Sequence, residues 1–280
     1  MTIRELRSKL SPPCPVIDVH AHPRGPLQTD SVAEDARGMA EAARRAGVER
    51  MCIFLLHPAS TKGDPGHEPS IEVCREGNDY NLQMRDEYPH LFLPFCYATP
   101  QFPEESVKEI DRCIVGERLY GIKLWVARHA TDPGMDPILS RATELGIPVL
   151  QHTWDKTTGN LPGESKPADI AHLARRHPDA KIIMAHLNGC GLRGIEHIRD
   201  CPNVTVDTSG GDPETGIVDA AASALGSERV AFASDLPVRL LSQSLGKTLG
   251  ADLSDQAKRD ILWNNAARLL PDWAGVKPLN

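Results

Sequence analysis

Short apolar runs recur along the whole chain, each followed by a polar loop and then by a helix-like stretch that ends in Gly, Asn or Asp. Eight runs can be marked, at residues 16–20, 51–56, 91–98, 121–126, 148–152, 182–186, 204–207 and 230–234. Each run is nearly continuous in apolar residues instead of alternating, which is typical of strands buried on both faces of a parallel sheet. The pattern therefore predicts eight parallel strands.

The stretches between the runs carry helix signals. Residues 31–46 start with a Ser/Asp cap signal and place apolar side chains at helical spacing. Residues 103–115 open with Pro-Glu-Glu, which suits a first helical turn. Further helices are expected at 166–177, 212–225 and 254–270. Gly47 and Gly146 stand just before runs, where glycine can close a helix in the left-handed conformation.

Eight strands alternating with about eight helices predict an α/β fold, the (β/α)₈ TIM barrel, with a doubly wound open sheet as the alternative. The average spacing of about 30 residues between runs favours the barrel. No linker or charge block divides the 280 residues. We expect one domain over residues 1–280, with 1–14 as an N-terminal extension and 254–280 as a C-terminal helix and tail. The loops 58–70 and 153–166 follow strands, so they belong at the catalytic mouth of a barrel.

Composition narrows the class of protein. The formal net charge is −7 and no run of Lys and Arg occurs, which argues against a nucleic-acid binder. Seven scattered cysteines with no CxxC argue against a disulfide framework, and Cys52 and Cys96 lie in apolar runs, where they are expected to be core residues. No signal-peptide pattern and no membrane-spanning apolar run is present. The scattered cysteines favour a reducing, cytoplasmic setting. We expect a small-molecule substrate. The oligomeric state, including a homo-oligomer, stays open.

Ligand-type side chains gather at the carboxyl ends of the predicted strands, which share one rim of a barrel. They are His20, His22, Lys123, His152, His186 and Asp235. Alternation along a strand points His20 and His22 to the same face, where two imidazoles can bind one cation. A single His at a strand end is most often structural, but the combination predicts a metal site. Nitrogen and oxygen ligands suit Zn²⁺, the ion we expect first, and also Mn²⁺, Fe²⁺ or Co²⁺.

The order of these motifs resembles the amidohydrolase superfamily, and within it the branch called amidohydrolase family 2. The resemblance covers nearly the whole chain, and it rests on Ile-Asp-Val-His-Ala-His, Gly-Ile-Lys-Leu, Val-Leu-Gln-His-Thr, Ile-Ile-Met-Ala-His-Leu-Asn-Gly, Phe-Ala-Ser-Asp-Leu-Pro and Asn-Asn-Ala-Ala-Arg-Leu-Leu. It implies a TIM barrel with a catalytic divalent metal and either hydrolase or non-oxidative decarboxylase activity. It also implies that the metal ligands are His20, His22, His152 and Asp235, with His186 as a ligand or catalytic residue.

Lys123 leaves the number of metal ions open. In binuclear superfamily members a Lys at this position is carboxylated and bridges two metals, whereas many members of the family 2 branch use one ion without a bridge. The segment Gly-Ile-Lys-Leu is similar to both. A Lys paired with a nearby carboxylate or with substrate is a further reading, so one or two ions are expected.

The expected mechanism starts from metal-bound water, whose pKa falls from about 15.7 to near 7. Asp235 would act as the proton shuttle, and His186 would bind a second metal or hydrogen-bond the developing oxyanion. Hydrolysis of a lactone, amide or related carbonyl compound is the first reading. A non-oxidative decarboxylase of an aromatic or unsaturated acid is the alternative. A catalytically inactive binding barrel is a minor third reading, because no expected ligand is missing.

Substrate contacts are sought just beyond the strand ends. Arg24 follows His22 by two residues and offers a guanidinium for a substrate carboxylate, while Trp125 and Trp154 can form an apolar wall. Further side chains beyond strand ends also hint at an anionic carbonyl substrate; they are Arg128, His129 and Arg239. His57 and His67 in the first mouth loop are weaker candidates for a place near the substrate.

Overall fold

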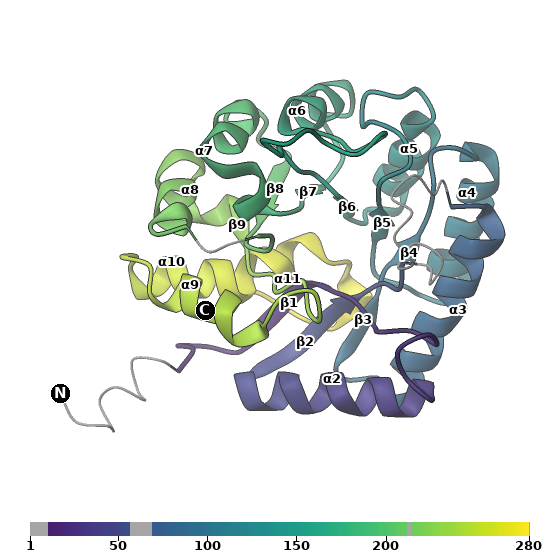
Figure 1. Ribbon diagram of the computed structural model, residues 1–280, viewed down its shortest axis with the longest axis horizontal. Coiled ribbons are helices and arrows are strands. Elements are labelled where there is room, and N and C mark those ends of the chain that lie inside the picture. The colour runs from purple at the N-terminus through teal and green to yellow at the C-terminus, as the bar shows by residue number, and fades with distance from the viewer. Residues whose placement is uncertain (1–10, 57–68, 212–213, 280) are drawn as a thin grey trace.

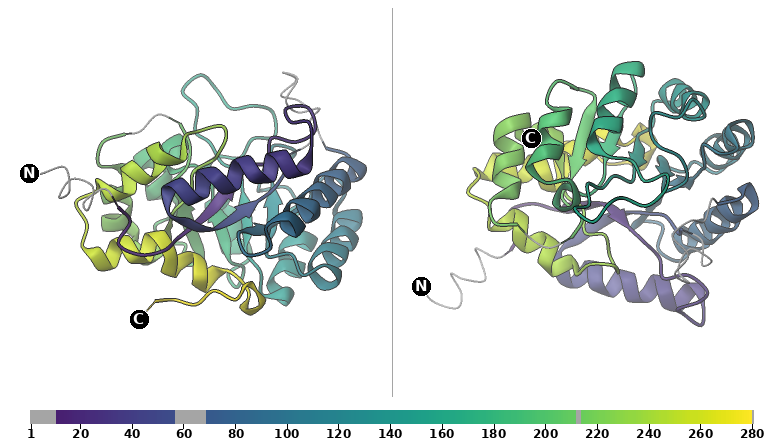
Figure 2. Two further views of the ribbon diagram at one scale, coloured as in Figure 1. Left: turned by 90° about the horizontal axis from the view of Figure 1, so that it is seen from below. Right: turned by 45° about the horizontal axis from the view of Figure 1, so that its top comes forward.

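The computed structural model describes residues 11–56, 69–211 and 214–279 of the chain. All strand pairs in these residues are parallel, and the strands follow one another in chain order within two sheets, β1-β2-β3 and β4-β5-β6-β7-β8-β9. The strands are β1 (Val16–Ala21), β2 (Val48–Ile53), β3 (Phe92–Pro94), β4 (Cys96–Tyr97), β5 (Ile122–Leu124), β6 (Val149–Gln151), β7 (Ile182–Met184), β8 (Val204–Asp207) and β9 (Val230–Ala231). Helices surround the strands on the outside (Figure 1, Figure 2).

The third predicted strand, residues 91–98, is divided into β3 and β4. The backbone N–H of Phe95 donates to the carbonyl of Ile53 at 2.9 Å, and the next N–H, that of Cys96, donates to the carbonyl of Gly121 at 2.8 Å. One continuous run therefore faces β2 with its first half and β5 with its second half. The prediction of a single uninterrupted strand was wrong at this point, although the run still occupies one position in the ring.

The ring is completed where the chain beyond β9 lies against β1. The N–H of Val19 donates to the carbonyl of Phe232 at 3.0 Å, the N–H of Asp235 donates to the carbonyl of His20 at 2.8 Å, and Ala21 forms a parallel bridge with Leu236. The two sheets thus meet at two places, between β3 and β4 and between β9 and β1, through individual hydrogen bonds. The fold is a (β/α)₈ TIM barrel, as the spacing of the apolar runs predicted, and not an open doubly wound sheet.

The helices pack outside this ring. They are α2 (Val32–Ala46), α3 (Ile71–Glu87), α4 (Pro103–Ile110), α5 (Met135–Leu145), α6 (Pro167–Arg176), α7 (Leu187–Ile198), α8 (Ile217–Leu225), α9 (Leu241–Leu249), α10 (Asp255–Arg259) and α11 (Asn265–Leu269). Short helical segments of other types are η2 (Asp111–Gly116), η3 (Ser227–Arg229), η4 (Asp260–Asn264) and η5 (Asp272–Ala274). Among these residues, no helix is both long enough and apolar enough to cross a membrane.

The predicted helix boundaries are confirmed where cap chemistry is strong. The Ser31 side chain accepts a hydrogen bond from the N–H of Glu34 at the start of α2, and Gly47 ends that helix with φ at +73°. The helix expected at 212–225 begins only at Ile217, and residues 212–213 lie outside the described part. The helix expected at 254–270 is interrupted, because the wider turns of η4 separate α10 from α11.

Two sets of buried apolar side chains hold the fold together. One set combines strand residues such as Ile17, Cys52 and Phe95 with C-terminal residues that include Trp263 of η4. The larger set lies mainly between strands and helices and includes Cys96. Cys52 and Cys96 are fully buried, as expected of core residues, and all seven cysteines are free. The strands are therefore buried on both faces, which fixes the side chains at their ends in space.

Candidate metal centre

The side chains predicted at the strand ends come together at one rim of the barrel. His20 and His22 stand at the end of β1, and Asp235 follows β9. The His20 Nε2 atom lies 3.2 Å from His22 Nε2, and the Asp235 Oδ1 atom lies 3.3 Å from His22 Nε2 and 3.6 Å from His20 Nε2. One ligand atom of each residue lies within 4.8 Å of the others, so the three could hold one metal ion.

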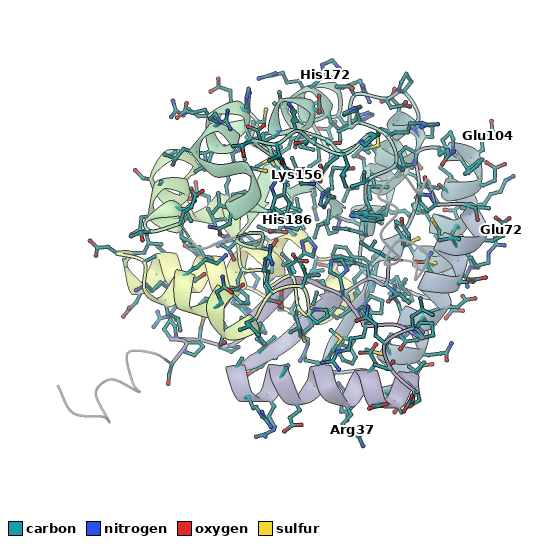
Figure 3. The ribbon with its side chains drawn as sticks, viewed as in Figure 1. Arg37, Glu72, Glu104, Lys156, His172 and His186 are labelled. Atoms are coloured by element: carbon teal, nitrogen blue, oxygen red, sulfur yellow. The ribbon has the colours of Figure 1, made fainter. Side chains whose placement is uncertain are left out.

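A second pair of imidazoles joins this group. His152 follows β6 and His186 follows β7, and the His186 Nε2 atom lies 3.1 Å from His152 Nδ1. The ring centroids of His20 and His186 are 4.9 Å apart. In Figure 3, His186 lies near the middle of the ring of strands, whereas Arg37 lies on an outer helix. All five predicted His and Asp positions are thus neighbours.

The hydrogen bonds of His20 and His22 test whether a cation fits between them. His22 Nδ1 lies 3.0 Å from the carbonyl oxygen of Phe54, which can only accept, and His20 Nδ1 lies 2.8 Å from Asp207 Oδ2. Each Nδ1 must therefore carry the ring proton, which leaves the lone pairs of both Nε2 atoms facing each other beside the Asp235 carboxylate. Such an arrangement of acceptors suits a metal ion.

The same reasoning applies to His152 and His186. His152 Nε2 lies 2.8 Å from Glu164 Oε1, and a carboxylate accepts, so the His152 Nδ1 lone pair faces inward. The Ser209 hydroxyl donates to Asp207 Oδ1 at 2.5 Å and accepts from His186 Nδ1 at 3.0 Å. The Nε2 lone pair of His186 is then also free. Four imidazole acceptors and one carboxylate converge, and the donor set fits a divalent cation.

Burial supports neutral imidazoles at this site. Burial, and next the nearby Lys123 charge, lower the pKa of His20 well below its ordinary value. Burial also lowers the pKa of His186 and that of His152. Burial raises the pKa of Asp235, but the neighbouring side chains of His22, His20 and Lys123 outweigh this effect, so the net pKa is lowered. Neutral His and ionised Asp are the protonation states that bind metals.

Lys123 is fully buried beside the imidazoles. Its Nζ atom lies 3.4 Å from His20 Nε2 and 4.5 Å from the ring centroid of Phe54. Burial lowers the pKa of Lys123 from 10.5 to about 7, although Asp207 and Asp235 act in the opposite direction. A substantial neutral fraction of this amine therefore exists at neutral pH.

Two of the site residues have unusual backbone conformations. His186 has φ at +70° and Asp235 has φ at +61°, in the left-handed region that side chains other than glycine rarely adopt. Only one other non-glycine residue in the described part of the chain, Arg118, shares this feature. Such conformations persist where the surroundings enforce them, and they concentrate at functional sites.

Three carboxylates that the sequence reasoning did not select support the ligands. Asp207, at the end of β8, contacts His20 as described and accepts from the backbone N–H of His186 at 2.9 Å. Asp18 accepts from the backbone N–H groups of His20 at 3.1 Å and Ser234 at 2.9 Å, so it joins the two chain segments that carry the predicted metal ligands. Glu164 contacts His152. Asp207 could have been found, because it ends an apolar run as the predicted ligands do.

A cavity of about 290 Å³ opens directly onto the cluster. Its walls include all three predicted substrate contacts, Arg24, Trp125 and Trp154, together with Lys123. Its other lining residues are His22, Pro23, Gln28, Leu55, Leu56, His152, His186, Asp235, Pro237 and Val238. Most of the exposed wall is apolar.

The remaining sequence candidates do not reach this cavity. Arg128 and His129 line a separate pocket with Pro162 and Gly163, and Arg239 lines neither of the two cavities. These three side chains therefore do not line this cavity, and their part in binding an anionic substrate stays a prediction. His57 and His67 lie outside the described residues.

A curated relative matches part of the chain. The 2-amino-3-carboxymuconate-6-semialdehyde decarboxylase of Dictyostelium discoideum is 24% identical over 141 residues, which is 44% of this chain and 39% of that protein. The matched segment thus spans well under half of the relative.

Solved structures match nearly the whole chain. The 2,6-dihydroxybenzoate decarboxylase from Rhizobium superposes with a TM-score of 0.71 at 17% identity, covering 91% of this chain and 98% of that one. A 5-carboxyvanillate decarboxylase from Novosphingobium aromaticivorans, solved with manganese and 4-hydroxy-3-methoxy-5-nitrobenzoic acid, gives 0.67 at 16% identity, covering 92% and 96%. At these identities the likeness establishes the shared fold. The family itself is established by a sequence model, which matches residues 17–271: this chain belongs to the amidohydrolase family, in the branch that its motifs indicated.

Proposed function

We propose that this enzyme is a metal-dependent, non-oxidative decarboxylase of a carboxylated aromatic or unsaturated acid. The observation that carries the proposal is the cavity over the imidazole cluster, with indole and aliphatic walls and with Lys123 and Arg24 as its cationic groups. Decarboxylases among the relative and the structural neighbours support the same reading. The decarboxylase thus takes precedence over the hydrolase, reversing the order that the motifs alone suggested.

The cavity suits a flat acid. Trp154 lies nearly parallel to the His152 ring, at 28° and 6.2 Å between centroids, and the Trp125 ring stands edge-on to it at 6.5 Å. Two indoles beside the ligands give a planar ring apolar contact, while the exposed Arg24 is placed to pair with a second anionic group. Apolar walls also remove water from the carboxylate that is to leave.

The reaction needs a proton and no oxidant. The bond between the ring carbon and the carboxylate carbon breaks, its electron pair stays on the ring carbon, and carbon dioxide leaves. A proton then adds to that ring carbon and forms the new C–H bond. Asp235 is ionised in the resting site, so it first accepts a proton from the substrate or from water and then delivers it to carbon. His186, whose Nε2 carries a lone pair, is placed to accept a hydrogen bond from a substrate hydroxyl.

The residues proposed to hold the ion are His20, His22, His152 and Asp235, with His186 as a further ligand or a substrate contact. When bound, a divalent ion supplies positive charge that anchors substrate oxygens and stabilises negative charge. Zn²⁺ and Mn²⁺ both accept this set of nitrogen and oxygen ligands. The manganese bound by the Novosphingobium neighbour makes Mn²⁺ the first ion to try.

Isotope tracing tests the proposal. The purified chain, loaded with Mn²⁺ or Zn²⁺, is supplied with a panel of hydroxylated aromatic and unsaturated acids in D₂O. We expect release of carbon dioxide and one deuterium at the carbon that lost it, with both abolished in Asp235→Asn. Turnover of lactones or amides with ¹⁸O from water in the product, and no carbon dioxide from any acid, would refute the decarboxylase reading.

Hydrolysis remains the second candidate because of Lys123. Its buried amine, with a pKa near 7, has the neutral form that carboxylation requires, and it stands beside the proposed ligand His20. Elemental analysis of gently purified protein separates the two readings. About one ion per chain, unchanged in Lys123→Ala, agrees with the decarboxylase, whereas about two ions, with the second lost in Lys123→Ala, supports a bridged binuclear hydrolase.

A further inference from the structure

A buried carboxylate on the loop between β6 and α6 contacts His152 on the side away from the other imidazoles. Glu164 is 1% exposed, and its Oε1 atom lies 2.8 Å from His152 Nε2. The opposite ring nitrogen, Nδ1, is the one that faces His186. Glu164 therefore determines which His152 nitrogen carries the proton and how the ring is turned.

Glu164 is itself held by three hydrogen bonds from two donor groups of its own loop. The Lys156 ammonium lies 2.7 Å from each of the two carboxylate oxygens, and the backbone N–H of Leu161 donates to Oε2 at 2.8 Å. The carboxylate thus has little freedom to rotate. A bidentate contact from a partly buried Lys also keeps the negative charge in place without solvent.

The same loop fixes the wall of the cavity. The Asn160 side chain donates to the carbonyl of Trp154 at 2.6 Å and accepts from the N–H of Lys156 at 2.9 Å, while the N–H of Trp154 donates to the carbonyl of Ser165 at 3.0 Å. The Lys156 Nζ atom stands 5.6 Å from the Trp154 ring centroid. Figure 3 shows Lys156 and His186 on the same part of the molecule, over the ring of strands.

We propose that Glu164 and Lys156 are positioning residues, which hold His152 with its Nδ1 lone pair directed at the metal. The inference rests on the metal centre of the proposed function and not on the reaction performed there. Residues that hydrogen-bond a metal-binding His in this way change metal affinity by about 10- to 100-fold when they are removed. Lys156 acts at one step further, through Glu164, so its removal should have the smaller effect.

Metal affinity without substrate is the test. The dissociation constant for Mn²⁺ or Zn²⁺ is measured on the full chain by competition with a chelator, and the unfolding temperature of the metal-free protein is recorded in parallel. Glu164→Ala removes the acceptor, Glu164→Gln keeps the shape but removes the charge, and Lys156→Met frees the carboxylate. Asp155→Asn is the matched control, because Asp155 lies on the same loop and pairs with Arg193 at 3.1 Å instead of with His152.

We expect the dissociation constant to rise toward 100-fold in Glu164→Ala, about tenfold in Glu164→Gln and less in Lys156→Met, with no change in Asp155→Asn. If Glu164→Ala does not fold, Glu164→Gln decides the matter. An unchanged dissociation constant in Glu164→Gln, or a lower unfolding temperature without weaker metal binding, overturns the proposal. An unaltered chain that binds neither ion refutes the metal centre itself, whereas metal binding without decarboxylation refutes only the proposed reaction.

Discussion

Replacing Asp207 by Asn should move the ring proton of His20 from Nδ1 to Nε2, while the volume of the side chain hardly changes. The Oδ1 atom of Asp207 accepts three hydrogen bonds, from the backbone N–H groups of His186 and Ser209, both at 2.9 Å, and from the Ser209 hydroxyl at 2.5 Å. Its Oδ2 atom lies 2.8 Å from His20 Nδ1. Three donors will keep the amide oxygen of Asn at the Oδ1 position, so the amide NH₂ must face His20.

That NH₂ group donates, so His20 Nδ1 would have to become the acceptor and the ring proton would move to Nε2. A protonated Nε2 cannot bind a metal ion. We therefore expect metal affinity to fall toward the upper end of the 10- to 100-fold range for supporting residues, where 100-fold corresponds to about 2.7 kcal/mol. The fold should survive, because the three bonds at Oδ1 are kept.

The assay is the dissociation constant for Mn²⁺ by chelator competition, together with urea unfolding of the metal-free protein. Glu109→Gln is the control, because Glu109 is an equally buried carboxylate that bonds Arg112 and Asn78 away from the metal site. Unchanged metal binding in Asp207→Asn would refute the reasoning. Either His20 would not bind through Nε2, or Asp207 would not set its tautomer.

Two further predictions concern the cavity wall and the pH dependence of stability. A Cβ at Gly189 would lie 2.7 Å from the Trp154 ring, so Gly189→Ala should shift the indole and change the tryptophan fluorescence. The same variant should raise KM about tenfold with little change in kcat. Gly38→Ala on α2, where the space is open, should change neither the fluorescence nor KM. An unshifted fluorescence spectrum in Gly189→Ala would argue against this wall. Burial raises the pKa of Glu109, but hydrogen bonds from Arg112 and Asn78 lower it by more, so the net pKa is below 4.5. A carboxylate whose pKa is lowered by folding stabilises the fold above pH 4.5, and this stabilisation is lost as the pH falls. Glu109→Gln should therefore cost about 1–3 kcal/mol in urea unfolding at pH 7 and progressively less below pH 4; an equal loss at both pH values would contradict it.

The sequence predicted much of the architecture because strands that are buried on both faces appear as continuous apolar runs. Continuous apolar runs located the strands, and the end of each run located the catalytic rim, so His20, His22, His152, His186 and Asp235 could be named before any contact was known. The division of the third run at Phe95 could not be predicted, since it depends on which neighbours the two halves meet.

The supporting contacts were decided only by the tertiary structure. His20 and Asp207 are 187 residues apart, and Asp18 and Ser234 are 216 apart, yet each pair is in hydrogen-bond contact. Periodicity reports which face a side chain occupies, but not which distant group completes its hydrogen bonds. For the same reason the sequence could not show that Arg128 lines a different pocket from Arg24. The sequence by itself determined the barrel and the rim where chemistry is expected. The packing of the ring determined which nitrogen of each His faces the proposed metal site, because the acceptors that fix the ring proton come from other strands and loops.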